Sequence, residues 1–171
     1  TYEVIFSEGR AEFRRRGHEI ETHAAMVGSP EDDIELRRIR LTNCSGTKRT
    51  IDLTSYAEVV LALPAADALH PAFSNLFVQT EIIRERQAIL STRRGRSQDE
   101  HAPWAFHLMA VRGPHSGEIS YETDRLQFIG RGRTLAAPQA LDHSGPLSGS
   151  QGSVLDPIVS IRCPIVLAPE E

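Results

Sequence analysis

The chain has 171 residues, of which 40% are hydrophobic and 25% are charged, as expected of a folded globular protein rather than a disordered one. Its 19 basic and 23 acidic residues give a net charge of −4, which excludes a general attraction to phosphate backbones, so no nucleic acid partner is expected. The longest apolar stretch, residues 59–66, contains Pro64 and is far shorter than the about 20 residues that cross a bilayer, so no direct membrane insertion is expected.

Short runs of alternating apolar and polar residues recur along most of the chain. This period of two is typical of antiparallel sheets, and helical periodicity is weak, so the sequence predicts an all-β protein. The first three predicted strands cover residues 2–7, 11–16 and 18–27. Glu8-Gly9 and Gly17 separate these strands, and the spacing predicts a meander.

The next segment shows a change of apolar phase. Leu36 and Ile39 would point to opposite faces of a regular strand, so a β-bulge is expected near residues 37–38. Residues 43–46 form a predicted turn, and the apolar residues of 51–61 follow it with a common face. This pattern predicts a hairpin across the turn.

The middle of the chain is less regular. Residues 64–75 are rich in Pro and Ala, and residues 76–83 and 87–92 are two predicted strands around the charged segment 84–86. A helix over residues 77–90 is the alternative.

The last third begins with a polar loop, residues 93–103. Predicted strands follow at residues 104–111, 118–123 and 126–129, and again from Val154. Residues 134–152 are rich in Gly, Ser, Pro and Ala, and we expect them to form a long surface loop that covers or lines a site.

The histidines are poorly spaced for a metal site. His18 and His23 are five residues apart and face opposite sides of a strand, and His101 and His107 are separated by a predicted loop boundary. No metal site and no cofactor are therefore expected.

Other catalytic patterns are missing from the sequence. Cys44 and Cys163 are too few for a disulfide framework and are expected to be unpaired in a reducing, intracellular setting. No G-x-S-x-G motif occurs, and the glycine-rich residues 130–133 do not match a P-loop. The residues therefore indicate no catalytic group.

Several aromatic side chains lie near polar residues that could bind sugar hydroxyl groups, and core packing is the alternative role for each. They are Phe73, Phe77, Trp104, Phe106, Tyr121 and Phe128.

Five segments, spread in order over most of the chain, carry a family resemblance. They are SPEDDIELRR at 29–38, LTSYAEVVL at 53–61, HPAFSNLFVQTE at 70–81, FIGRGR at 128–133 and VLDPI at 154–158. Together they resemble the N-terminal β-domain of the glycoside phosphorylase family that includes cellobiose and chitobiose phosphorylases. The resemblance is strongest to the corresponding region of cyclic β-1,2-glucan synthases.

The resemblance implies an antiparallel β-sandwich of the galactose-mutarotase-like supersandwich type. It implies a single domain fragment over residues 1–171, with further strands of the domain missing at the N-terminus. In this family the sandwich precedes an (α/α)6 barrel that holds the general acid, and no residue here matches that acid.

The resemblance also implies a role and a setting. We expect a non-catalytic, carbohydrate-associated domain whose partner is the catalytic (α/α)6 barrel of its own polypeptide, with β-glucan as a candidate ligand. The parent polypeptide is expected to be a glycosyltransferase or inverting glycoside phosphorylase, associated with the cytoplasmic face of a bacterial inner membrane.

We also expect a set of side chains to bind carbohydrate or the barrel, and all of them except Trp104 lie within the similar segments. They are His70, Phe73, Asn75, Phe77, Glu81, Trp104, Arg131 and Arg133. Pro71 restricts His70 to an extended backbone, and the glycines at 130 and 132 permit tight turns that project the two arginines. The alternative is that both arginines form internal salt bridges at a hairpin.

Two other functions remain open at this point. One is an independent aldose mutarotase or epimerase in which His70 or His107 shares proton transfer with an acidic residue. The other is a free-standing, lectin-like module with Trp104 as its sugar platform.

Overall fold

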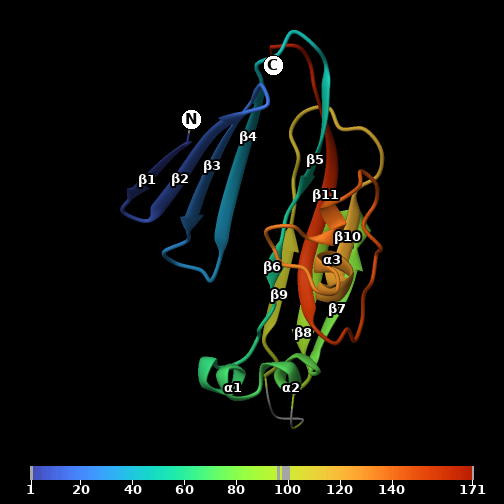
Figure 1. The fold of residues 1–171 in the computed structure, drawn as a ribbon. Helices are drawn as coiled ribbons and strands as arrows, with labels where there is room; N and C mark the ends of the chain where they lie inside the picture. The colour runs from blue at the N-terminus through green and yellow to red at the C-terminus, as the bar shows by residue number, and fades with distance from the viewer. Residues whose placement is uncertain (1, 96, 98–100, 171) are drawn as a thin grey trace. The chain divides into compact units, whose positions relative to one another are not determined.

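The computed structural model describes residues 2–95, 97 and 101–170, and it consists mostly of antiparallel β-sheet (Figure 1). The chain divides into two compact units, residues 1–51 with 166–171 and residues 52–165. Among the described residues, no helix combines the length and the apolar character needed to cross a bilayer.

The first unit contains a four-stranded meander. Its strands are β1 (Tyr2–Ser7), β2 (Arg10–Gly17), β3 (Ile20–Gly28) and β4 (Glu35–Asn43), paired in sequence order. Gly9 forms its turn at φ 68°, and His18 and Glu19 both have positive φ, as in the tight hairpin turns that match strand twist. The predicted meander is confirmed, although His18 belongs to a turn rather than to the third strand.

The β-bulge expected near residues 37–38 is wrong. The β3–β4 register runs without interruption from Ile20 opposite Asn43 to Gly28 opposite Glu35. Leu36 and Ile39 lie on opposite faces of this regular strand, as their spacing requires. Because the meander carries apolar side chains on both faces, no bulge is needed to bring the two together.

The hairpin expected between residues 34–43 and 51–61 is also wrong. β5 (Arg49–Thr54) pairs with β11 (Pro157–Leu167), in a sheet of order β10-β11-β5, whereas β4 pairs with β3. The long strand is interrupted as well, because β6 is limited to Ala57–Glu58. Turn residues at 43–46 reverse the chain, but they do not determine which strand β5 pairs with.

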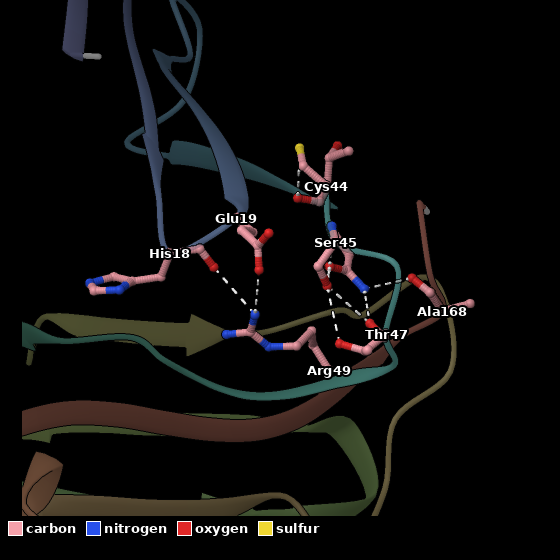
Figure 2. Close-up of polar contacts among 9 residues, drawn as sticks. His18, Glu19, Cys44, Ser45, Thr47, Arg49 and Ala168 are labelled. Carbon is pink, nitrogen blue, oxygen red and sulfur yellow. Dashed lines mark hydrogen bonds and ion pairs between the residues drawn. The ribbon is translucent and has the colours of Figure 1, made fainter.

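The reversal itself is built around the buried side chain of Asn43. Its Nδ2 donates to the carbonyl oxygens of Thr47 and Ala168, both at 2.8 Å, and its Oδ1 accepts from the backbone N–H of Ser45 at 3.0 Å. Figure 2 shows Ser45, Thr47 and Ala168 in this network, together with Arg49, which donates to the carbonyl of His18 at 3.3 Å. A side chain thus satisfies the backbone groups that a hairpin ladder would otherwise pair.

The second unit contains two sheets and several short helices. One sheet holds β10 (Ser120–Asp124), β11 and β5, with β6 on β11, and the other holds β7 (Val78–Ile83), β8 (Ala88–Arg93) and β9 (Trp104–Leu108). The helices are α1 (Pro64–Leu69), α2 (Pro71–Asn75), α3 (Arg125–Ile129) and the 3₁₀ turns η1 (Arg84–Arg86) and η2 (Gln139–Leu141).

The core of this unit lies between the two sheets. It is formed by Val78 and Ile89 from one sheet and by Tyr121, Val159 and Ile161 from the other, with Val59 after β6. Residues from both sheets share one apolar cluster, which is the arrangement of a β-sandwich. The expected all-β sandwich is therefore confirmed.

Two local predictions need correction. Residues 126–129 form helix α3, not a strand, because the Asp124 side chain caps the helix by accepting from the N–H of Leu126 at 2.8 Å. The helix buries Phe128 and Ile129 against Ile158. The alternative helix over residues 77–90 is wrong, since β7 and β8 pair there around η1, as the strand prediction stated.

The Pro-Ala-rich segment forms two short helices. Pro64 and Pro71 occupy the first turn of α1 and α2, where the missing N–H of proline costs no hydrogen bond. Both helices lie at one end of the second unit (Figure 1).

Candidate functional site

A pocket of about 480 Å³ lies beside α1 and α2. The polar residues around it are Glu58, Asp67, Asn75, Arg125 and Asp156. They come from β6, the two helices, the start of α3 and the segment before β11, so tertiary packing joins residues far apart in sequence. We call Glu58, Asn75, Arg125 and Asp156 the Arg125 cluster.

Arg125 holds this cluster together. Its Nε lies 3.1 Å from Oε1 of Glu58, and its Nη1 lies 3.7 Å from Oδ2 of Asp156. Asn75 donates from Nδ2 to Oδ1 of Asp156 at 3.0 Å. One guanidinium therefore joins two carboxylates. With both carboxylates ionised, the single positive charge of Arg125 leaves the cluster with a net negative charge.

Burial shifts the pKa of Asp156, which lines the pocket, and of Tyr56, which contacts the lining residue Glu58. It raises the pKa of Asp156, and the nearby Arg125 partly offsets that rise. Burial also raises the pKa of Tyr56 to about 12, and the Tyr56 hydroxyl donates to Oε1 of Glu58 at 3.0 Å. Among the described residues no group of His, Cys, Asp and Glu could hold a metal ion. Through two carboxylates, a guanidinium and the Asn75 amide, the cluster can offer hydrogen bonds and charge to a partner.

Exposed apolar side chains occur in the pocket lining, where Val60 and Leu155 lie, and in or directly beside the helices α1 and α2. They are Val60, Leu63, Leu69, Phe73, Leu76 and Leu155. Leu63, Leu69 and Leu155, at 78%, 73% and 75%, are the most exposed leucines among the described residues, and apolar side chains gathered in one part of a surface suit protein contact. We call these six residues, with the Arg125 cluster, the α1–α2 surface.

Four of the predicted site residues fall in this part of the fold. His70 lies between α1 and α2, exposed and outside the pocket lining, whereas Asn75 lines the pocket. Phe73 packs edge-on against Phe77, with 5.2 Å between ring centroids. Arg93 lies over the Phe77 ring at 5.4 Å, so Phe77 is held in a structural stack.

Glu81 and Trp104 lie on a different surface, the outer face of the β7-β8-β9 sheet. Trp104, Phe106 and Leu108 alternate along β9 and are 67%, 66% and 52% exposed. Glu81 shares their face, because it lies opposite Leu90, which lies opposite Phe106. We call the three β9 residues the β9 stripe.

The two predicted arginines separate in the structure. Arg133 forms an ion pair with Asp142 at 2.6 Å, and this hydrogen bond lowers the pKa of Asp142. Arg131 is exposed and makes no polar contact within residues 2–95, 97 and 101–170. The internal salt bridge thus holds for Arg133, although it forms after helix α3 rather than at a hairpin.

The histidines of the mutarotase alternative do not meet in a pocket. His70 is exposed between two helices, and His107 lies in β9 with its Nε2 2.7 Å from Oγ of Ser55. Neither lines the pocket of the Arg125 cluster.

Comparison with known proteins decides the family. All of residues 1–171 match the family model described as glycosyl hydrolase 94, supersandwich domain. The chain belongs to this family. It is also 40% identical over 157 residues to the protein named cyclic beta-(1,2)-glucan synthase NdvB from Rhizobium meliloti (strain 1021). The alignment covers 92% of this chain and 6% of that relative, so the chain spans a small part of the relative's length.

The resemblance inferred from the five segments is confirmed by these matches. The supersandwich domain belongs to a family whose parent proteins are enzymes, and it corresponds to an accessory part of a larger, glycosyl hydrolase-like protein.

Sequence reasoning missed most of the Arg125 cluster. Glu58 and Asp156 lie within two of the segments that carry the resemblance, but their neighbours are apolar strand residues and nothing local marks the two as partners. Arg125 adjoins a segment that was predicted to be a strand. Two buried charges, Glu122 and Arg162, were also missed, although a charged residue inside the apolar run of residues 157–163 is a usable signal.

Proposed function

We propose that this supersandwich domain is a non-catalytic scaffold that holds the catalytic domain of its own longer polypeptide through the α1–α2 surface. The observation that carries the proposal is the exposure of Leu155, which lines the pocket with the charged cluster, and of Leu63 and Leu69 at the two ends of α1, which contributes Asp67 to that pocket. Exposed leucines can be buried against a partner domain, while a nearby cluster of charges fixes the orientation of that partner.

The occupant we assign to this surface is an (α/α)6 barrel. The chain aligns with 6% of a relative named as a glucan synthase, so most of such a polypeptide lies outside the domain and leaves ample room for a separate catalytic domain. In this proposal the parent is a glycosyltransferase or inverting phosphorylase, β-glucan is the handled sugar, and the parent works at the cytoplasmic face of a bacterial inner membrane.

The side chains of the pocket support a role in binding rather than catalysis. Inverting glycoside chemistry needs an acid and a base on opposite sides of the scissile bond. Here Glu58 and Asp156 both lie against Arg125, as salt-bridge partners do. We expect the isolated domain to release no glucose 1-phosphate from β-glucosides in the presence of phosphate, and measurable release would contradict the proposal.

A paired set of variants in the full-length polypeptide tests the interface. Leu63→Ser with Leu69→Ser removes apolar contact from the proposed surface, and Leu135→Ser with Leu141→Ser is the matched control, because these leucines are also exposed, at 51% and 56%. We expect the first pair to lower glucan synthesis at least about fivefold and to increase hydrogen exchange in the barrel.

The control pair should leave both the turnover and the exchange of the barrel unchanged. Circular dichroism of the domain carrying each pair checks that the fold is intact. Equal activity in the two double variants would remove the α1–α2 surface as the interface.

A second candidate function rests on the β9 stripe. Trp104 and Phe106 present exposed rings on one edge strand, with Glu81 on the same face, and aromatic rings with nearby polar groups suit sugar binding. This favours a lectin-like contact with β-glucan. Trp104 is the chain's single tryptophan, so its fluorescence reports the contact directly.

In this experiment cyclic β-1,2-glucan is titrated into the domain. A saturable fluorescence change that disappears for Phe106→Ala but persists for Leu141→Ala is expected if the stripe binds glucan. A flat titration would leave the scaffold as the function of the domain.

A further inference from the structure

A second cavity, of about 260 Å³, lies between the β10–β11 pair and the long loop that follows α3. It is separate from the α1–α2 surface and from the β9 stripe, and it shares no lining residue with the first pocket. Its lining combines two buried charges, Glu122 and Arg162, with exposed polar side chains of the loop.

Glu122 is 1% exposed and has no cation within ion-pair distance in the described part of the chain. Its Oε1 accepts from the N–H groups of Thr123 and Asp124, both at 2.9 Å, and its Oε2 accepts from the hydroxyl of Ser148. A carboxylate can accept about four hydrogen bonds, so Oε2 retains capacity toward the cavity.

Arg162 is 3% exposed and likewise lacks a carboxylate within ion-pair distance among the residues described. Its Nε donates to Oγ1 of Thr54 at 2.9 Å, its Nη1 to the carbonyl of Gly145 at 2.7 Å, and its Nη2 to the carbonyl of Ala140. A guanidinium has five N–H groups, so two remain without these partners. The floor of the cavity therefore offers both acceptors and donors.

The mouth of the cavity adds four polar side chains. Gln127, Gln139, His143 and Ser144 line it, are exposed, and make no hydrogen bond through their side chains within residues 2–95, 97 and 101–170. They supply amide, imidazole and hydroxyl groups that can donate as well as accept. Among the described residues that line the cavity, His143 carries the one aromatic ring, and hydrogen bonding is the main contact that the lining offers.

We propose that this cavity binds one hexose unit, free or at the end of an oligosaccharide. The volume is near the lower end of small-ligand sites, which suits a single ring rather than a nucleotide or a peptide. A cavity lined by one buried anion and one buried cation disfavours a charged ligand, whereas the several hydroxyl groups of a sugar can donate to a carboxylate and accept from a guanidinium. The proposal goes beyond the scaffold function and does not rest on it.

Titration with glucose and with β-1,2-linked glucobiose, followed by ¹H–¹⁵N NMR of the 171-residue chain, tests this site. We expect saturable shifts at half-saturating sugar concentrations in the millimolar range, confined to residues 120–127 and 139–148. Gln139→Ala with His143→Ala should weaken binding at least about fivefold, since each lost hydrogen bond to a ligand is worth a few-fold to about tenfold.

The matched control is His101→Ala with His115→Ala, which removes two exposed side chains outside the cavity and should leave the affinity unchanged. Glu122→Gln keeps the shape of the side chain, removes its charge, and should also weaken binding. Absence of shifts up to about 50 mM sugar, equal weakening in the control, or tighter binding of inorganic phosphate than of glucose would each overturn the proposal. Tryptophan fluorescence measures sugar binding at the β9 stripe, and hydrogen exchange of the barrel measures the interface. A failure of the hexose site is therefore distinguishable from a failure of either function proposed above.

Discussion

The meander of the first unit and the sandwich of the second are built from similar alternating sequences, yet they bury very different amounts of side chain. In the four meander strands, Ala25 and Asn43 are the buried residues, whereas residues 157–163 of β11 are buried without interruption. The meander pairs strands that follow one another in sequence, and the sandwich joins β5 to β11 across about a hundred residues.

The two units differ in what determines their strand pairing. Two-residue turns align β1 with β2 and β2 with β3, so the register of the meander follows from local geometry. The sandwich depends on apolar burial between sheets, so its partners are chosen by the core as a whole. We therefore expect core substitutions to act strongly on the second unit, and single apolar substitutions to act weakly on the meander.

The largest effect is expected for Ile161→Ala. Ile161 is fully buried between the two sheets, so the change should lower the free energy of unfolding by about 2–5 kcal/mol. Ile5→Ala in the meander, where Ile5 is 37% exposed, should cost less than about 1 kcal/mol. Chemical denaturation with residue-level hydrogen exchange measures both, and equal costs would break the comparison.

Asn43→Ala should reveal a non-local contact within the first unit. The change removes the Nδ2 donor from the carbonyls of Thr47 and Ala168 and the Oδ1 acceptor from the N–H of Ser45, at a cost of roughly 1–3 kcal/mol. Thr47→Ala is the control, since Thr47 contributes its backbone carbonyl to Asn43. Faster exchange in β4 for the first variant alone is the expected result, and equal exchange in both would show that local turns suffice.

Gly130→Ala probes backbone strain at the end of α3. Gly130 has φ 87° and ψ 157°, a region open almost only to glycine, and an added Cβ would lie 2.7 Å from Oε1 of Gln139. We expect a loss of about 1–3 kcal/mol in thermal or chemical unfolding. Gly28→Ala in the meander, which meets nothing within 4 Å, should be nearly neutral, and a comparable loss there would contradict this account.

The smallest effect is expected from pH and lies in the meander. Nε2 of His23 lies 2.6 Å from Oε2 of Glu12, and this hydrogen bond lowers the pKa of Glu12 below 4.5. A carboxyl whose pKa is lower in the folded state stabilises the fold above its unfolded pKa, and that stabilisation is lost as the pH falls through the folded value. Exchange in β2 and β3 should therefore rise below about pH 4.5.

Carbonyl ¹³C NMR measures the Glu12 pKa directly. Glu12→Gln should remove the acid-dependent part of the exchange, while Glu8→Gln, in the exposed turn between β1 and β2, should leave it in place. Acid sensitivity that persists in Glu12→Gln would assign the effect to another group.

Part of the site could be read from the sequence and part could not. Binding by Asn75 and Trp104 stays a prediction from the sequence, and the structure adds that Asn75 lines a pocket and that Trp104 is exposed. The role of Arg125 could not be predicted from the sequence, because its partners Glu58 and Asp156 lie 67 and 31 positions away and no local pattern connects them. The long loop was predicted to line a site, and it lines the second cavity.

The sequence by itself determined the all-β class, the meander and the β7–β8 pair, because period-two alternation and turn residues act over a few positions. The family followed from the resemblance of five segments, which periodicity alone does not give. Only the tertiary structure decided that β5 pairs with β11 rather than with β4, that residues 125–129 form a capped helix, and that Glu122 and Arg162 line one cavity. These outcomes depend on which distant groups bury one another and satisfy their hydrogen bonds, and that competition is settled only when the whole chain folds.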